Sequence, residues 1–353
     1  MHATETQLVL GVDAGGTKTT AWLARYTRDA PDSRQPQSLC DAVQIIGQGA
    51  AGPGNPRAIG FEAAAAAIQE AIAAAYAQSD AAGETAAGEP AAAACLAVAG
   101  AGRREEQQRL YNLCMQHNVA RQMQVIGDAV PVLAAACGHL PAAALWPLRG
   151  VALIAGTGSM AWGCNTLDAA GHLKQSRVGG WGYVLGDEGS GYWIGLAALR
   201  AVCRAADGMA PPTELTHCLL HALGLSEPTE LIGKIYGAGW DRRHVAGLAP
   251  LVVQLATPGS SRKVDAVAAE IVAHAAQELA ALVRQVAQQL GLDQRPVVQS
   301  QPPIALALAG GVLTGSQFVC SRLQAELADL PLEPIVVPSP VLGAVYLAAA
   351  ELA

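Results

Sequence analysis

The stretch from Leu8 to Thr20 combines residues whose types and spacing suit the binding of a phosphate group. It reads as a buried strand that carries Asp13 near its end, a turn at Gly15 and Gly16 followed by hydroxyl side chains, and a second strand. Adjacent glycines let the backbone approach a ligand closely, and the N–H groups of such a turn can point at an anion. A carboxylate at the strand end can hold hydrated Mg²⁺, which prefers oxygen ligands. The alternative is an ordinary β-hairpin.

A second stretch, from Gly150 to Gly163, has the same layout, with its turn at Gly156, Thr157, Gly158 and Ser159. Neither stretch matches the glycine patterns that open a helix in the commoner phosphate-binding motifs. Similar hairpins in the two halves of one chain predict an internal duplication, with a nucleotide clamped between the halves.

Composition narrows the class of protein. The 353 residues are enough for two domains, and the 52% of apolar residues suits a globular protein rich in buried strands. The net charge of −7 and the lack of a basic stripe argue against nucleic acid as a partner. Its longest apolar stretch, 91–101, is about half of a membrane span. With eight scattered cysteines, no C-x-x-C pair and no visible signal peptide, we expect a reduced, cytoplasmic protein.

The elements expected around these motifs alternate between strands and helices. In the first half, strands over 8–12, 19–24 and 42–46 form a meander, after which helices and strands alternate up to Asp128. Loops are expected over 47–54, which is rich in glycine, and over 79–90, which is low in complexity. The second half repeats the opening hairpin and continues as a mainly helical region over 196–290. The pattern predicts mixed α/β sheets.

Asp128 is the candidate general base. It follows a short strand over 122–126, at the kind of strand end where ligands gather in open α/β sheets. In phosphoryl transfer to an alcohol, a carboxylate can orient the hydroxyl and accept its proton. The alternative is that Asp128 caps a helix over 129–137. Both roles can coexist.

The segment from Gly179 to Gly195 joins seven glycines to large aromatic side chains and the pair Asp187 and Glu188. Glycines allow a close approach to a ligand, aromatic rings supply flat apolar faces, and carboxylates accept hydrogen bonds from hydroxyls. This combination favours a sugar ring as the ligand. The alternative is a connector whose aromatic side chains fill a core between domains.

Two further sites carry both a functional and a structural interpretation. Asn55 is a candidate substrate contact, or else a turn residue or helix cap before Pro56. Gly310 and Gly311 end an apolar strand over 304–309 and suit close approach of an adenine or ribose, or else form a tight turn from strand to helix.

Taken together, these motifs resemble the sugar kinases of the actin/hexokinase/Hsp70 ATPase superfamily, and within it the BadF/BadG-type ATPase family and the N-acetylglucosamine kinases. The resemblance covers nearly the whole chain. Its most specific parts are the blocks over 180–182 and 186–190, which resemble the N-acetylglucosamine kinase signature. The resemblance implies two actin-like, ribonuclease H-like α/β domains, each a mixed five-stranded sheet with helices, and an active site in the cleft between them.

The resemblance also implies roles for individual residues. Asp128 is the implied base for the C6 hydroxyl of an amino sugar, and Asp13 the implied Mg²⁺ ligand. ATP is expected to contact Gly15, Gly16, Thr17, Lys18, Gly156, Thr157, Gly158, Ser159, Gly310 and Gly311. The sugar is expected to contact Asn55, Gly180, Trp181 and Asp187. Closure of the domains excludes water from the reaction.

One departure from the family pattern affects the expected substrate. Met160 stands where the mammalian-type kinases carry an asparagine that contacts the sugar or its acetyl group. The expected reaction is ATP-dependent phosphorylation of N-acetylglucosamine, with glucosamine kinase or a BadF-type ATPase that activates a partner enzyme as alternatives. A sugar-sensing protein that has lost catalysis is disfavoured by the presence of both hairpins and Asp128.

The expected domains are 1–135, rejoined by a terminal helix at 339–353, and 136–338, with the helical region inserted. The expected cofactors are ATP and Mg²⁺. The expected partners are a small-molecule amino sugar and a second copy of the chain in a homodimer, without nucleic acid or membrane.

Overall fold

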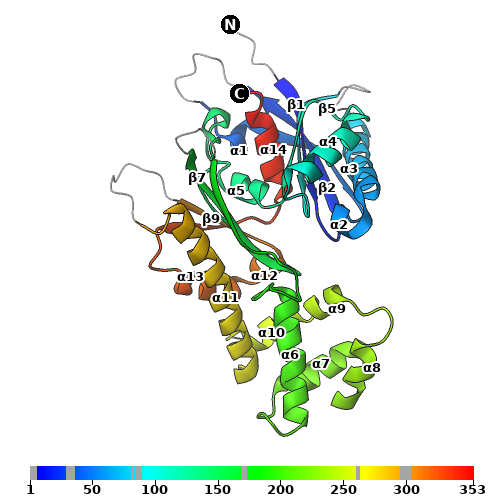
Figure 1. Ribbon diagram of the computed structural model, residues 1–353, viewed down its shortest axis with the longest axis vertical. Helices are drawn as coiled ribbons and strands as arrows, with labels where there is room; N and C mark the ends of the chain where they lie inside the picture. The colour runs from blue at the N-terminus through cyan, green and yellow to red at the C-terminus, as the bar shows by residue number, and fades with distance from the viewer. Residues whose placement is uncertain are drawn as a thin grey trace. The chain divides into compact units, whose positions relative to one another are not determined.

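The computed structural model describes residues 6–28, 36–81, 83, 90–167, 173–259, 263–294 and 304–353. These residues form two units (Figure 1). Unit 1 holds the described residues within 1–149, 165–173 and 339–353, and unit 2 holds those within 150–164 and 174–338. The segment 136–149 therefore packs with unit 1, whereas the expected boundary placed it in the second domain. The reason is local: the short helix η1 (Ala142–Ala144) contacts the C-terminal helix α14 (Val341–Ala350) of unit 1.

Unit 1 is built on a five-stranded sheet with the order β3-β2-β1-β4-β5. The strands are β1 (Thr6–Ala14), β2 (Thr19–Thr27), β3 (Val43–Ala51), β4 (Ala91–Val98) and β5 (Ala120–Gly127). The first three form an antiparallel meander, whereas β4 and β5 run parallel to β1. Strand β1 is buried on both faces, because Leu10 and Val12 pack in the core cluster that includes α3 and Val9 is fully buried as well.

The helices of unit 1 are α1 (Leu39–Ala42), α2 (Pro56–Ile59), α3 (Phe61–Ala81), α4 (Arg104–Met115), α5 (Val130–Ala136) and α14. Helix α3 packs on β2 and β3, while α14 packs on β1, β4 and α5. Figure 1 shows α14 in red among the blue and cyan elements of unit 1, so the two ends of the chain contribute to one unit.

Two loop predictions in unit 1 are corrected. The expected loop over 47–54 is strand as far as Ala51, because β3 pairs with β2 over its length and continues past a bulge at Leu23 and Ala24. The expected loop over 79–90 begins later than predicted, since α3 continues to Ala81. Residues 82 and 84–89 of that stretch lie outside the described residues.

Unit 2 repeats this sheet, with the order β10-β9-β6-β7-β8. The strands are β6 (Gly150–Ala155), β7 (Ser159–Leu167), β8 (Leu173–Gly179), β9 (Ile304–Ala309) and β10 (Leu332–Val336). As in unit 1, the first two strands are antiparallel, and the first strand pairs in parallel with the one on its other side. The fold class and the internal duplication predicted from the sequence are confirmed by this equivalence.

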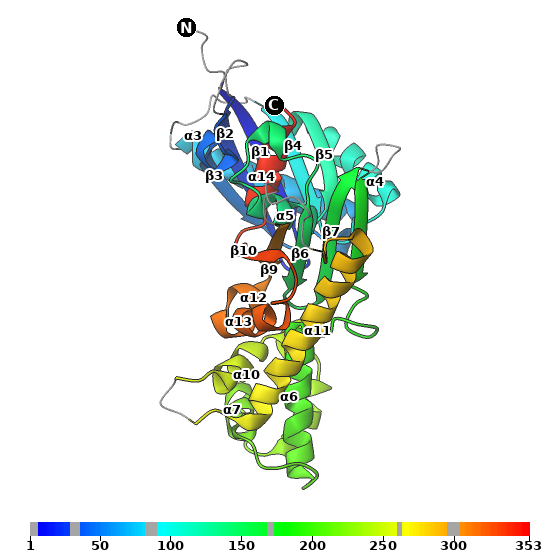
Figure 2. The same ribbon diagram turned by 90° about the vertical axis from the view of Figure 1, so that its left-hand side faces the viewer.

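The helical part of unit 2 stands between β8 and β9 in the sequence, apart from α12 (Gly311–Thr314) and α13 (Gln317–Glu326). It consists of α6 (Gly191–Ala206), α7 (Glu214–Leu223), η2 (Pro228–Glu230), α8 (Leu231–Ile235), α9 (Arg242–Ala246), α10 (Ala249–Ala256) and α11 (Ala266–Leu290). Helices α6, α10 and α11 pack against one another (Figure 2). Among the described helices α11 alone has the length and apolarity of a membrane span, yet Val272, Leu279 and Val283 on it are fully buried in the core of unit 2.

Candidate active site

The first predicted phosphate hairpin is the turn between β1 and β2. The N–H of Gly15 donates to the carbonyl oxygen of Lys18 at 2.9 Å, which closes the turn. Thr17 and Lys18 are exposed, and a Cβ placed on Gly16 meets no atom within 4 Å. The turn therefore has open space beside its backbone, as the binding of a phosphate group requires.

Two carboxylates stand at the same edge of the unit 1 sheet. Because β1, β4 and β5 are parallel, their carboxyl ends lie together: Ala14 pairs with Val98, and Val98 pairs with Gly127. Asp13 is the second-last residue of β1, and Asp128 directly follows β5. Ligands of open α/β sheets gather at this edge.

The carboxyl group of Asp13 titrates far from its ordinary range. Burial raises the pKa of Asp13 to about 7, the negative charge of Asp128 adds to the rise, and the positive charge of Lys18 opposes it. A pair of interacting carboxylates, one of them partly buried, is a donor set that suits a hard cation, which lowers the cost of holding both groups ionised. The residues present therefore fit a Mg²⁺ site.

Asp128 lies directly before the N-cap residue of helix α5. Helix α5 begins at Val130, and its N-cap residue is Ala129, whose own side chain makes no capping hydrogen bond. Asp128 lies one residue earlier, in the turn that leaves β5. Asp128 is therefore at the carboxyl edge of the sheet, one position before the N-cap of α5.

Asn55 caps a helix and lies beside the first hairpin. Its Oδ1 accepts a hydrogen bond from the N–H of Arg57 at 2.9 Å, which caps the short helix α2. The N–H of Gly54 donates to the carbonyl oxygen of Gly15 at 2.9 Å, which fixes the preceding backbone on the hairpin. The capping interpretation of Asn55 is confirmed, and the same packing places the residue next to the predicted phosphate turn.

The second predicted hairpin, between β6 and β7, lies beside Gly310 and Gly311. The N–H of Gly156 donates to the carbonyl oxygen of Gly158 at 2.9 Å and closes the turn. Gly310 has a φ of 91°, and a Cβ on it clashes with the backbone of Ala155, so only glycine fits. Gly311 opens helix α12 into unobstructed space. The sequence-predicted phosphate and adenosine motifs of unit 2 therefore lie together.

Asp187 faces this hairpin. It has a φ of 66°, is 5% exposed, and accepts a hydrogen bond at Oδ1 from the N–H of Ser159 at 3.2 Å. A Cβ on Gly158 comes within 2.7 Å of the carboxylate. Burial raises the pKa of Asp187, and the N–H of Ser159, the positive charge of Arg242 and the N–H of Gly182 act against the rise.

The neighbouring candidates Gly180 and Trp181 are placed differently. Gly180 donates its N–H to the carbonyl oxygen of Ser159 at 2.9 Å and accepts at its own carbonyl oxygen from Arg177 Nη2 at 2.7 Å. The side chain of Trp181 is 75% exposed. A large ring held in solvent on a fixed backbone is an available face for a ligand.

The candidates thus form two groups, one in each unit, and each group includes residues that sequence reasoning missed. In unit 1, buried Thr19 donates its hydroxyl to the carbonyl oxygen of Gly52 at 2.9 Å. In unit 2, Arg242 acts on Asp187, and its guanidinium lies 6.0 Å from the ring centre of Tyr183. These contacts join residues more than thirty positions apart, and no local motif signals them.

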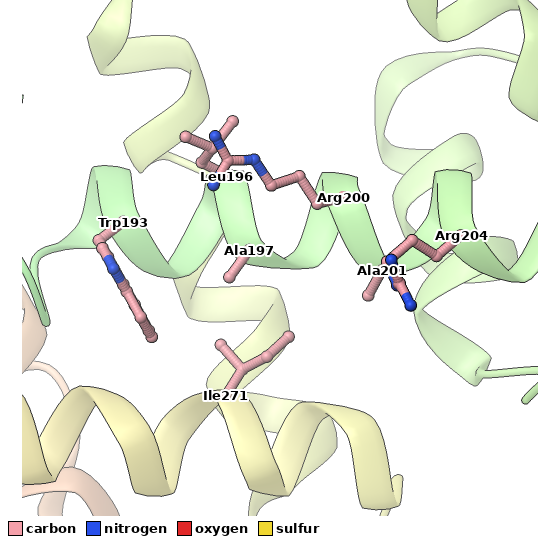
Figure 3. A pocket seen from close by; sticks show the side chains of 7 residues that line it. All are labelled: Trp193, Leu196, Ala197, Arg200, Ala201, Arg204 and Ile271. Carbon is pink, nitrogen blue, oxygen red and sulfur yellow. The ribbon is translucent and has the colours of Figure 1, made fainter. Parts of the chain in front are cut away.

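A groove elsewhere in unit 2 contains none of these candidates. It has a volume of about 290 Å³ and lies between α6 and α11. Figure 3 shows Trp193 and Ala197 of α6 directed toward α11, with Ile271 opposite. The groove is lined by Trp193, Leu196, Ala197, Arg200, Ala201, Arg204 and Ile271. The motifs, rather than this groove, define the candidate site.

Comparison with curated proteins finds sugar kinases. Over 231 residues the chain is 30% identical to a protein of Clostridium acetobutylicum named N-acetylmuramic acid/N-acetylglucosamine kinase. This match covers 65% of this chain and 67% of that protein. Over 150 residues it is 39% identical to the N-acetyl-D-glucosamine kinase of Dictyostelium discoideum. That second match spans 42% of this chain and 43% of its relative, less than half of either length.

Solved structures share the fold. A candidate N-acetylglucosamine kinase from Chromobacterium violaceum matches with a TM-score of 0.62 and 22% identity, over 97% of this chain and 98% of that one. A second, from Porphyromonas gingivalis, matches with a TM-score of 0.61 and 19% identity, over 98% and 100% of the two chains. A family model matches residues 10–348, nearly the whole sequence. The chain therefore belongs to the BadF/BadG/BcrA/BcrD ATPase family.

Proposed function

We propose that this protein is an ATP-dependent kinase that phosphorylates the C6 hydroxyl of an amino sugar, with N-acetylglucosamine as the substrate. The observation that carries the proposal is the pair of carboxylates, Asp13 and Asp128, at the sheet edge beside an open glycine turn. The names of the two curated relatives support the substrate class.

Asp128 is the proposed general base. In this proposal its carboxylate would accept the proton of the C6 hydroxyl as the hydroxyl oxygen attacks the terminal phosphorus of ATP and ADP leaves. Orientation of the hydroxyl would supply much of the rate. Asp128 directly follows Gly127, which pairs with Val98 of β4. The sheet therefore fixes the backbone next to the proposed base. The proposal therefore assigns to Asp128 both orientation and proton transfer.

Asp13 is the proposed residue for Mg²⁺, and the two glycine turns are the proposed residues for ATP. Bound Mg·ATP supplies the transferable phosphoryl group and neutralises its charge. In unit 1 the proposed phosphate contacts are the backbone of Gly15, Gly16 and Thr17 and the side chain of Lys18. In unit 2 the corresponding residues are Gly156, Thr157 and Gly158, with Gly310 and Gly311 for the adenosine.

Asn55, Gly180, Trp181 and Asp187 are the proposed sugar contacts. Trp181 offers an exposed ring for an apolar face of the sugar, and Asp187 offers carboxylate oxygens for its hydroxyls. Asn55, whose Oδ1 accepts the capping hydrogen bond, offers its amide N–H donors to the sugar oxygens. Met160, on β7 opposite Ile154, carries no hydrogen-bond donor for an acetyl group. Glucosamine is therefore the second substrate to test, beside the N-acetylmuramic acid in one relative's name.

The test is Mg·ATP turnover with a panel of sugars. We expect strong turnover with N-acetylglucosamine, weaker turnover with glucosamine, N-acetylmannosamine, N-acetylmuramic acid and glucose, and none with 6-deoxy-N-acetylglucosamine. Turnover of the 6-deoxy sugar contradicts the assignment of the C6 hydroxyl. ATP hydrolysis that no sugar stimulates contradicts the kinase and favours an ATPase that activates a partner protein.

The proposal includes a cytoplasmic homodimer as the working form. Sedimentation at equilibrium checks the assembly: a mass near twice 36.1 kDa supports a homodimer, and a mass near 36.1 kDa contradicts it.

A further inference from the structure

The two phosphate hairpins use the first residue of their outgoing strand in the same way. Thr19 opens β2 opposite Ala14, and Ser159 opens β7 opposite Ala155, so they are equivalent positions of the repeated sheet. Both side chains are buried. The hydroxyl of Thr19 donates to the carbonyl oxygen of Gly52 at 2.9 Å, and that of Ser159 donates to the carbonyl oxygen of Glu188 at 2.6 Å.

A second hydrogen bond is also repeated. The carbonyl oxygen of Gly15 accepts from the N–H of Gly54 at 2.9 Å, and that of Gly156 accepts from the N–H of Gly191 at 2.8 Å. Each hairpin is thus tied by two equivalent bonds to a segment far along the chain. We call residues 52–55 the first anchor segment and residues 180–191 the second anchor segment. They carry the proposed sugar contacts.

The tie is tighter in unit 2. Besides its hydroxyl bond, Ser159 donates its N–H to Asp187 Oδ1 at 3.2 Å and accepts at its carbonyl oxygen from the N–H of Gly180 at 2.9 Å. Its N–H and its hydroxyl hydrogen are its only donors, and both are used within the second anchor segment. In this arrangement both donors of Ser159 are bonded within the protein, whereas the family resemblance implies that Ser159 contacts ATP.

We propose that Ser159 is a positioning residue, through which a sugar held by the second anchor segment sets the position of the second phosphate turn. The inference rests on the proposed function of that segment. Because Ser159 contacts Gly180, Asp187 and Glu188 at once, any shift of the segment moves the residue that directly follows the turn. Sugar and nucleotide then bind cooperatively, and each raises the affinity for the other by the same factor.

The experiment is a coupling measurement on Ser159→Ala. This variant removes the bond to Glu188 but retains the Cβ and the backbone bonds, so the protein is expected to fold. Calorimetry gives the dissociation constant of a non-hydrolysable Mg·ATP analogue with and without N-acetylglucosamine. We expect the sugar to tighten nucleotide binding in the unsubstituted protein and this effect to fall about three- to tenfold in the variant, as the loss of one hydrogen bond predicts.

Ser159→Thr is the matched variant. It restores a hydroxyl, and a threonine already fills the equivalent position at Thr19. We expect it to recover the cooperativity. An unchanged coupling factor in Ser159→Ala overturns the inference, and so does a lower melting temperature with an unchanged factor, which indicates a merely structural role.

Failure of the underlying function is distinguishable from failure of the inference. If the unsubstituted protein phosphorylates none of the sugars in the panel, the proposed function is overturned and the inference with it. If it phosphorylates an amino sugar while Ser159→Ala keeps the full coupling, only the inference is overturned.

Discussion

Asp128 and Asp13 interact electrostatically across the carboxyl edge of the unit 1 sheet. The charge of Asp128 adds to the burial that brings the pKa of Asp13 to about 7. The two residues come from strands that do not touch each other, since β4 lies between β1 and β5. Two carboxylates in this relationship suit one cation and one base, and the first two predictions follow from it.

Asp128→Asn is expected to lower kcat about 100-fold or more, because an amide cannot accept the hydroxyl proton. The affinities for ATP and for the sugar are expected to stay within a few-fold, since the amide keeps the size and an oxygen acceptor. Steady-state kinetics and calorimetry measure the two effects. Near-normal turnover in the variant would remove Asp128 as the base.

The metal-free protein is expected to lose stability as the pH rises from about 4 to about 7. The pKa of Asp13 is higher in the folded state, about 7, than its ordinary value of 3.8, so the folded state holds an extra proton between these values. The stabilisation from that proton is complete below pH 4 and lost as the pH rises through 7. The slope for one proton is at most about 1.4 kcal/mol per pH unit.

Urea unfolding at several pH values without Mg²⁺ measures this dependence. Asp13→Asn is expected to gain stability relative to the unsubstituted protein as the pH rises, because it carries no charge to bury. Asp128→Asn is expected to lower the pH at which the loss of stability ends, since removal of the neighbouring negative charge lowers the pKa of Asp13 in the folded state. Parallel curves for all three proteins contradict the assignment.

Gly310→Ala and Gly311→Ala form a matched pair. The first places a Cβ against the backbone of Ala155 at a φ of 91°, so it is expected to destabilise unit 2 by about 2 kcal/mol or more. The second meets no atom within 4 Å and is expected to leave stability unchanged while raising the KM for ATP. Melting temperature and ATP kinetics separate the two. An unaltered KM in Gly311→Ala excludes close approach of the nucleotide there.

Asn55→Asp and Asn55→Ala separate the cap from the sugar contact. Aspartate keeps the acceptor for the N–H of Arg57, so the cap and the melting temperature are expected to persist, whereas alanine is expected to cost about 1 kcal/mol. Since aspartate also removes the amide donors, we expect its KM for the sugar to rise about tenfold. A normal KM in Asn55→Asp indicates that Asn55 acts only as a cap.

The sequence was sufficient for features that depend on neighbours along the chain. The glycine turns at 15–16 and 156–158 lie between strands, as predicted, and Ile304–Ala309 is a strand. The two similar hairpins in the sequence correctly predicted two similar sheets. Apolar runs and turn residues act through local backbone preferences, so strands and turns can be predicted from the sequence alone.

Other features were decided by tertiary structure. The glycine-rich stretch 47–51 is strand because β2 pairs with it, and the N-cap of α5 is Ala129, one residue after Asp128. Likewise, Ser159 directs its N–H to Asp187 and its hydroxyl to the carbonyl oxygen of Glu188. The strand pairing and the bonds of Ser159 join residues more than twenty positions apart, and no local pattern specifies such hydrogen bonds. The sequence alone indicated which residues are candidates for the chemistry, because residue types and turn signals are local. The tertiary structure decided which of these candidates lie together and which hold the others in place, because those contacts join distant parts of the chain.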